Sequence, residues 1–166
     1  MAKTKLIKWA KQALYLIIML TVITMAMDWW RGRHLDKQNL PPLTATSIQG
    51  ENVNLAELSK DQAVLVYFWA TWCQVCNYVT PAVNSIANHN PTLSVAIRSG
   101  DDARLNQYTQ HHEYQFHVIN DPSGQLSQMW NIAVTPTIMV VKDNQIVHYT
   151  TGFTSLPGLW WRMMFA

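Results

Sequence analysis

The chain has 166 residues and a formal net charge of +2, but the charge is unevenly distributed. Lys3, Lys5, Lys8 and Lys11 stand near the start with no acid among them, whereas from Pro41 onward five basic residues face eight acidic ones, a formal net charge of −3. No basic patch for nucleic acid is expected. The roughly 125 residues after the N-terminal region suffice for one compact domain and not for two.

Residues 12–30 predict a transmembrane anchor. The stretch from Gln12 to Met27 carries no charge, and with its flanking tryptophans it approaches the roughly 20 residues that a bilayer helix needs. The lysines make residues 1–11 a cytoplasmic tail, so the C-terminal domain lies across the membrane. A cleaved signal peptide is the alternative, but Thr24-Met25-Ala26 is a poor cleavage site with bulky residues after it. We therefore expect a single-pass inner-membrane protein with a periplasmic domain.

Residues 31–42 are polar, end in two prolines and are predicted to be a linker; residues 43–166 form the domain. Periodicity and turn residues predict its elements. In chain order they are a hairpin over 44–55, a helical turn over 55–58, a buried strand over 63–70, a helix over 73–89, a strand over 93–97, a helix over 103–112, a strand over 116–119, a turn over 120–124, a short helix over 126–130, a second hairpin over 137–151 and a helix over 155–165. This order predicts a three-layer α/β/α sandwich with a mixed sheet.

Cys73 and Cys76 are the only cysteines, and they stand where the buried strand gives way to a helix. A helix N-terminus favours the thiolate and lowers a cysteine's pKa below its usual value of about 8.5. Cys73 at the helix start is the expected attacking thiolate, and Cys76 the shielded resolving thiol. The alternative is half of a zinc site, but a closed zinc site needs four ligands and no second pair of ligands is present.

The sequence resembles thioredoxin-fold proteins over residues 41–152. The similarity rests on the stretch from Phe68 to Cys76, on Pro81 five residues after the second cysteine, and on Val134-Thr135-Pro136-Thr137 before a strand. An extra helix and strand before this last motif resemble the insertion of the membrane-anchored TlpA/ResA-like branch. The turn Arg98-Ser99-Gly100-Asp101-Asp102 and the ending 150–159 are similar to the suppressor-of-copper-sensitivity group, the ScsD type.

The resemblance implies a protein disulfide oxidoreductase that needs no cofactor beyond the redox-active disulfide Cys73–Cys76. It implies that Pro136 is cis and packs opposite that disulfide, which leaves the Thr135 backbone free to pair with an extended substrate strand. Trp72 is expected to cap the active-site surface. The implied partners are protein thiols and disulfides and a membrane electron donor of the DsbD type.

One departure concerns the proton of the resolving thiol. Many thioredoxins carry a buried aspartate where this chain has Tyr67, and a phenol is a poor base at neutral pH. Glu113 is the only acid near the inserted helix, and we expect it to be a solvated surface charge. Gln74 and Val75 between the cysteines bring no charge, which favours a reducing or intermediate potential over a strongly oxidising one.

A Cu(I) carrier or sensor is the rival function, since thiolates and methionines suit Cu(I) and eight methionines are present. Five of them lie in the predicted anchor or at the extreme C-terminus, where Met163 and Met164 end an aromatic tail. We therefore predict no resident metal. A scaffold without chemistry is the third possibility, and the retention of Cys73, Cys76 and Pro136 speaks against it.

Overall fold

The computed structural model describes residues 8–9, 11–16, 18–19, 22–23, 26 and 40–166. The chain divides into two compact units, Met1–His34 and Leu35–Ala166. The described residues of the first unit are helical, and no helix among the described residues is both long and apolar enough to cross a membrane. Much of the predicted anchor over 12–30 and nearly all of the linker over 31–42 lie outside the described residues. These segments and the predicted domain boundaries stay predictions.

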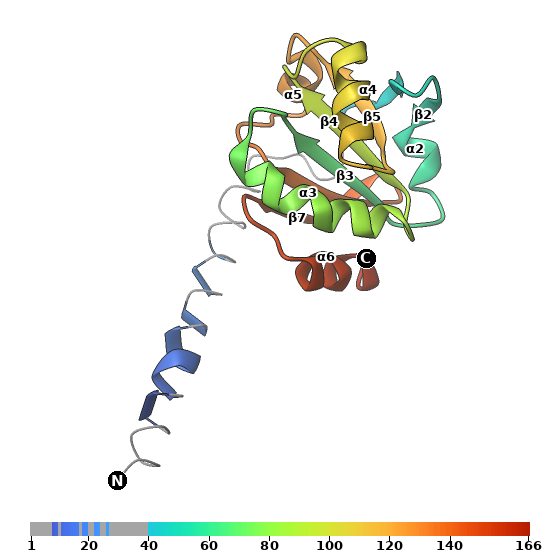
Figure 1. Cartoon of the computed structure of the whole chain (residues 1–166). Helices are drawn as coiled ribbons and strands as arrows, with labels where there is room; N and C mark the ends of the chain where they lie inside the picture. The colour runs from blue at the N-terminus through green and yellow to red at the C-terminus, as the bar shows by residue number, and fades with distance from the viewer. Residues whose placement is uncertain (1–7, 10, 17, 20–21, 24–25, 27–39) are drawn as a thin grey trace. The chain divides into compact units, whose positions relative to one another are not determined.

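The second unit contains seven strands and five helices among its described residues (Figure 1). The strands are β1 (Thr44–Thr46), β2 (Asn52–Asn54), β3 (Val64–Trp69), β4 (Thr92–Ile97), β5 (His117–Asp121), β6 (Thr137–Lys142) and β7 (Gln145–Thr151). The helices are α2 (Leu55–Leu58), α3 (Gln74–Ala87), α4 (Asp102–His111), α5 (Gln125–Met129) and α6 (Leu156–Met164). Strands β1 and β2 form the predicted N-terminal hairpin, and the other five form one sheet in the order β5-β4-β3-β6-β7.

The central strand β3 is buried on both faces, because helices cover both sides of the sheet. It pairs in parallel with β4 and antiparallel with β6, so the sheet is mixed as predicted. Leu65, Tyr67 and Trp69 face a core shared with α3, α4 and α6, while Val66 and Phe68 face a core shared with α2, α5 and the β1–β2 hairpin. Alternation along one strand thus builds two separate cores. The arrangement is the predicted three-layer thioredoxin fold.

Helix α3 carries the active-site segment and lies beside α6 beneath the sheet (Figure 1). Its inward side chains recur at helical spacing: Val79, Val83 and Ile86 are fully buried. Pro81 lies within the helix. In α6, Leu159 and Met163 are buried, and Pro157 falls in the first turn as predicted. Pairing two amphipathic helices on one face gives the start of α3 a rigid support.

The inserted helix and strand are α4 and β5, and β5 extends the sheet at its edge. Strand β5 differs from its predicted range, because it starts after Phe116 and continues through Asp121, which was expected in a turn. The reason is long-range pairing: Ala96 and Ile97 of β4 pair in parallel with Asn120 and Asp121. Phe116 is buried although it lies outside the strand.

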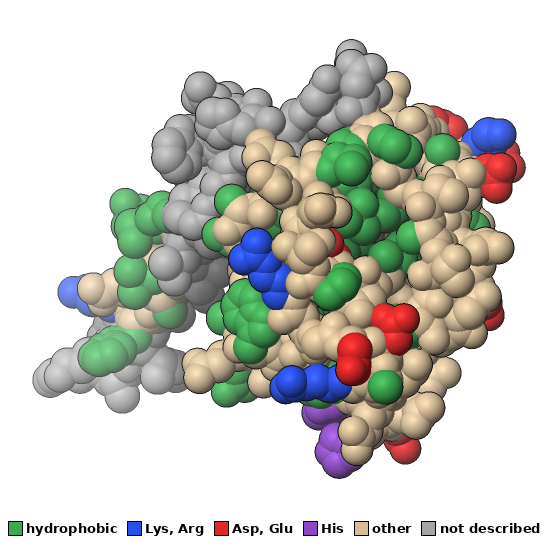
Figure 2. All heavy atoms as spheres, turned by 90° about the horizontal axis from the view of Figure 1, so that it is seen from above, with side chains coloured by type: hydrophobic (Ala, Val, Ile, Leu, Met, Phe, Trp, Pro, Cys, Tyr) green, Lys and Arg blue, Asp and Glu red, His purple; other side chains and the backbone are tan. Residues whose placement is uncertain are grey.

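Charged side chains on the face shown in Figure 2 form small, separate groups. Basic side chains lie apart from one another there, and no continuous basic area covers this face. The predicted lack of a nucleic-acid surface stays a prediction, since a single face is in view.

Candidate active site

The two cysteines lie where β3 passes into α3. Cys73 is the N-cap residue of α3, and Cys76 lies in its first turn. The two are joined by a disulfide with their Cα atoms 5.2 Å apart, and Cys73 Sγ accepts a hydrogen bond from the Cys76 N–H at 3.2 Å. Cys73 is 6% exposed and Cys76 is 1% exposed. Cys73 is therefore the more exposed of the two residues, and its role as the attacking thiolate stays a prediction.

The turn between β4 and α4 holds the loop that carries Cys73. Ser99 Oγ accepts the Thr71 N–H at 3.0 Å, and the Arg98 carbonyl accepts the Trp72 indole N–H at 3.2 Å. Arg98 turns the chain after β4 with a positive φ of 46°, and its own N–H donates to the Asp121 carbonyl at 2.9 Å. These bonds tie the active-site loop to two neighbouring strands and fix the position of the Trp72 ring.

Thr135 and Pro136 precede β6, and the peptide bond between them is cis. Strand pairing sets Phe68 of β3 opposite Thr137 of β6, so Pro136 lies beside the end of β3 from which the active-site loop departs. Pro136 is buried and Thr135 is half-buried. The Pro136 carbonyl accepts the Gly152 N–H at 2.9 Å. Among the described residues, no hydrogen bond to the Thr135 backbone is found.

Trp72, the residue before Cys73, and Thr135 line one hollow of about 380 Å³. The loops at this edge of the domain also expose large apolar side chains: Trp72 is 62% exposed, Val134 44% and Phe153 71%. Exposed apolar side chains that gather near a reactive group are typical of a surface that contacts another protein. The predicted role of Trp72 in covering the active-site surface stays a prediction.

A hydroxyl pair lies beneath the first turn of α3. Thr80 Oγ1 donates to the Cys76 carbonyl at 2.7 Å, which leaves it to accept from the Tyr67 hydroxyl at 2.8 Å. Burial raises the pKa of Tyr67 far above its usual value, so the phenol stays neutral and does not act as a base at neutral pH. Glu113 is exposed just past the end of α4, as expected for a solvated charge.

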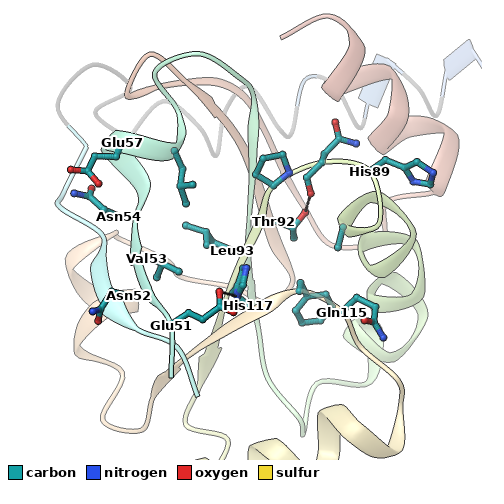
Figure 3. Close-up of a pocket in the computed structure, with 15 residues that line it drawn as sticks. Glu51, Asn52, Val53, Asn54, Glu57, His89, Thr92, Leu93, Gln115 and His117 are labelled. Atoms are coloured by element: carbon teal, nitrogen blue, oxygen red, sulfur yellow. Dashed lines mark hydrogen bonds and ion pairs between the residues drawn. The ribbon is translucent and has the colours of Figure 1, made fainter. Parts of the chain in front are cut away.

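A hollow of about 530 Å³ lies at the other edge of the sheet, where β4 and β5 begin (Figure 3). In it Glu51 and His117 point toward one another and are 3.3 Å apart. This hollow holds neither cysteine. Within the described residues, no group of three or more His, Cys, Asp or Glu side chains is arranged to hold a metal ion.

Sequence reasoning found the residues that carry the chemistry and missed those that support them. The structure joins Cys73 to Cys76 and places Trp72 and Thr135 at one hollow. It adds Arg98 and Ser99, whose contacts hold the active-site loop. Their position was the available signal, because the carboxyl ends of adjacent parallel strands meet at one edge of a sheet.

The fold and the disulfide at the start of α3 define a thioredoxin-like disulfide oxidoreductase. The chain belongs to the AhpC/TSA family, whose sequence pattern matches residues 37–150. It is 38% identical over 163 residues to a thioredoxin-like protein of Haemophilus influenzae, covering 98% of this chain and 97% of that protein. It is 23% identical over 152 residues to the thiol-disulfide oxidoreductase ResA of Bacillus thuringiensis, covering 84% and 87% of the two chains.

Among solved structures, the exposed lipoprotein thioredoxin Etrx1 of Streptococcus pneumoniae resembles the chain with a TM-score of 0.66. The identity is 20%, and the match covers 76% of this chain and 100% of that one. At this identity the likeness concerns the fold alone. The sequence relatives and the Cys73–Cys76 disulfide identify this protein as a thiol-disulfide oxidoreductase, and the chain is similar to ResA.

Proposed function

We propose that this protein is tethered to the inner membrane and exchanges disulfides with partner proteins in the periplasm. The observation that carries the proposal is the disulfide at the N-terminus of α3, where the more exposed sulfur, Cys73, caps the helix. The unpaired N–H groups and the dipole of a helix start stabilise a thiolate at that position.

In the reducing direction, the Cys73 thiolate attacks one sulfur of a partner disulfide and expels the other as a thiolate. The Cys76 thiol then loses its proton and attacks Cys73, which releases the partner's second sulfur. Two electrons pass from the dithiol to the partner, and Cys73 and Cys76 end as a disulfide. The reverse sequence donates a disulfide. Cys76 is 1% exposed, so an attack on it from outside is disfavoured.

The substrate segment is proposed to lie across Trp72 and Thr135. An extended segment that passes over their shared hollow would pair with the unpartnered backbone of Thr135, as strands added to a sheet edge do. Pro136 holds this segment of backbone beside the end of β3. Trp72 and the exposed apolar side chains near it would supply sequence-tolerant contact area.

We propose a reducing or intermediate potential, because Gln74 and Val75 between the cysteines bring no charge that would stabilise the thiolate further. Equilibration with glutathione at defined ratios, read by the fraction of alkylated protein, measures the potential. A value near about −120 mV, that of a strong periplasmic oxidant, would contradict this part of the proposal.

The location and the electron source rest on the sequence of the N-terminal segment and on the similarity to membrane-anchored relatives. A lysine-rich start before an uncharged stretch favours a retained anchor with the domain outside the cytoplasm. We propose that a donor of the DsbD type re-reduces the pair and that proteins oxidised under copper stress are among the clients, a proposal supported only by the ScsD-type similarity of the sequence. Membrane fractionation with protease accessibility in spheroplasts tests the topology, and a domain degraded only after lysis of the inner membrane would contradict it.

Trapping tests the central proposal. The Cys76→Ala variant should accumulate mixed disulfides with partner proteins, because Cys73 still attacks and no thiol is left to resolve the product. The Cys73→Ala variant is the matched control and should trap few or none. Trapping in equal amounts by the two variants would reverse the assigned roles, and an absence of any disulfide exchange by the native protein would overturn the proposal.

A further inference from the structure

Two hollows adjoin Trp72, and arginine is the only charged residue type in their linings. The first, of about 380 Å³, is lined by Arg98 and by Thr135. The second, of about 280 Å³, contains Arg98 and Arg104 and extends to Tyr108. The exposed Trp72 thus shares its two hollows with two arginines, although the domain as a whole carries more acid than base.

Two glycines allow these arginines to lie close to the backbone. A Cβ atom at Gly124 would lie 2.9 Å from Nε of Arg98, and one at Gly100 would lie 2.7 Å from Cδ of Arg104. Both glycines have positive φ, 78° and 105°. Arg98 Nε also donates to the Ser123 carbonyl at 3.3 Å. The guanidinium group of Arg98 is therefore held at the rim of the hollow instead of extending freely into solvent.

Neither arginine forms an ion pair with another described residue. The nearby carboxylates of Asp101 and Asp102 line a third hollow, which Arg98 also lines and Trp72 does not, and both carboxylates already accept hydrogen bonds. Asp101 caps α4 by accepting the Arg104 N–H at 2.8 Å, and Asp102 accepts from Asn120 Nδ2 at 2.7 Å. No carboxylate of the described residues therefore forms an ion pair with either guanidinium group, which leaves both able to bind an anion from outside.

Resting on the proposed function, we infer that Arg98 and Arg104 recognise carboxylates that flank the reactive cysteine of the partner protein. A guanidinium group binds a carboxylate through two parallel hydrogen bonds, which fixes orientation as well as charge. The segment seated at Thr135 carries its flanking residues past Trp72 and so past both arginines. The occupant is an acidic segment of a protein substrate, selected mainly through faster encounter.

The test measures how fast the reduced full-length protein, held in a nonionic detergent, reacts with three synthetic peptides. The peptides share one cysteine, activated as a 2-pyridyl mixed disulfide, and differ in having Glu, Gln or Lys on both sides of it. The Cys73 thiolate attacks the peptide sulfur and expels pyridine-2-thione, which absorbs light. Cys76 then loses its proton and attacks Cys73, the peptide leaves as a thiol, and two electrons have passed from the protein to the peptide disulfide.

At an ionic strength of about 0.01 M, the Glu peptide should react roughly three- to tenfold faster than the Gln peptide, and the Lys peptide more slowly than both. Raising the ionic strength to about 1 M shortens the Debye length from about 30 Å to about 3 Å and should bring the ratios close to one. The full-length protein has a formal net charge of +2, so the arginine variants and their control, and not the peptide order alone, separate the local arginines from the overall field.

Replacing both residues, Arg98→Gln with Arg104→Gln, should abolish the preference for the Glu peptide. Lys60→Gln is the matched control, because it removes a positive charge at the far end of β3 and should keep the preference. The double variant Arg98→Lys with Arg104→Lys keeps both charges and should retain part of the preference for the Glu peptide. If the Gln double variant does not fold, the Lys double variant and the salt series still test the inference.

Equal rates for the three peptides with the native protein would overturn the inference and leave the proposed function standing. A preference that survives in the Gln double variant would overturn it as well. If no peptide reacts at all, both the inference and the proposed function are wrong.

Discussion

Tyr67 stands on β3 where many thioredoxins carry a buried aspartate, and the structure shows what replaces the carboxylate. The phenol is fully buried and donates to Thr80, which in turn donates to the Cys76 carbonyl. This pair of hydrogen bonds supports the first turn of α3 without placing a charge there. Burial raises the pKa of Tyr67, so its contribution at neutral pH is structural.

Replacing this phenol, Tyr67→Phe, should lower the free energy of unfolding by about 1 kcal/mol, because one buried hydrogen bond is lost while Thr80 keeps its bond to Cys76. The pH profile of the Cys73 reaction with a model disulfide should stay unchanged. Denaturant unfolding and stopped-flow kinetics measure the two quantities. Tyr78→Phe, at an exposed position, is the control, and a displaced pH profile in the Tyr67 variant alone would show that the phenol takes part in proton transfer.

A second prediction concerns Gly124, where the positive φ and the close approach of the Arg98 side chain both disfavour any residue with a Cβ atom. Gly124→Ala should lower the free energy of unfolding by about 1–2 kcal/mol through its positive φ and should also displace the Arg98 side chain. Gly50→Ala is the matched control, since Gly50 has a similar φ of 88° and nothing within 4 Å of the added Cβ.

Unfolding curves and the peptide assay should separate these two effects. Both glycine variants should lose similar stability, but the Gly124 variant alone should lose preference for the Glu peptide. If Gly50→Ala reduces that preference equally, the close approach of Arg98 to Gly124 does not matter for binding.

At the residue scale, the two cysteines could be predicted from sequence because their spacing along the chain alone brings them to the same helix start. The spacing of Cys73 and Cys76 puts both sulfurs at one helix start whatever the rest of the fold does. The supporting contacts of Arg98 and Ser99 could not be predicted in this way. They join positions more than 25 residues apart in the chain, and such bonds depend on how β3 and β4 pair and on how the turn after β4 bends.

Among the elements, α5 depends on a carboxylate that the sequence placed in a turn. Its N-cap residue is Gly124, which offers no side-chain acceptor. Asp121 supplies that acceptor from the end of β5: its carboxylate accepts the Leu126 N–H at 3.2 Å and the Ser127 N–H at 2.8 Å. The helix is five residues long, too short to be stable by itself, so these bonds hold one wall of the hollow at Trp72.

Removing the carboxylate with Asp121→Ala should therefore cost about 1–3 kcal/mol of stability, since the buried Ser127 N–H and the half-buried Leu126 N–H lose their acceptor. Hydrogen exchange at the amides of α5 should accelerate more than exchange in α3. The exposed Asp61 provides the control variant Asp61→Ala, which should change neither quantity. Uniform acceleration of exchange across the domain would mean that Asp121 supports the whole fold and not α5 in particular.

Element types were predictable throughout the domain because the apolar spacing changes clearly between strands and helices. The ends of β5 could not be predicted in this way. Asn and Asp are common turn residues, and Asn120 and Asp121 belong to the strand only because they pair with β4. The cap of α4 was predictable from sequence, because Asp101 lies just before a helical pattern and accepts from Arg104.

On the scale of the whole molecule, the sheet order is set by the connections. Consecutive strands joined by helices are usually neighbours in a sheet, as β3, β4 and β5 are here, and β6 and β7 form a hairpin on the other side of β3. The sequence therefore sufficed for the three-layer fold. The sequence did not predict how the aromatic residues of the core shared with α3, α4 and α6 pack together. These residues come from β3, from α4 and from the segment that leads into β5, which are far apart in the chain. Their rings form one contiguous cluster of Tyr67, Trp69, Tyr108, Tyr114 and Phe116.

This cluster predicts how the stability of the domain depends on alkaline pH. Burial, reinforced by the neighbouring phenol of Tyr108, raises the pKa of Tyr114 to about 12, and burial raises the pKa of Tyr67 and Tyr108 in the same direction. In the unfolded chain these phenols ionise near pH 10. Above about pH 10 the unfolded state therefore binds fewer protons than the folded state, so stability falls as pH rises.

The free energy of unfolding, measured by denaturant titration, should thus be steady with respect to these phenols below about pH 10 and decline from there toward about pH 12. The Tyr114→Phe variant should decline less steeply, because one phenol with a raised pKa is gone. Tyr78→Phe, at a position 75% exposed, should decline like the native protein. Lysines ionise in this range in all three proteins and cancel in the comparison. Parallel curves for the native protein and the Tyr114 variant would contradict the prediction, since the folded state would then hold the Tyr114 proton no more tightly than the unfolded chain does.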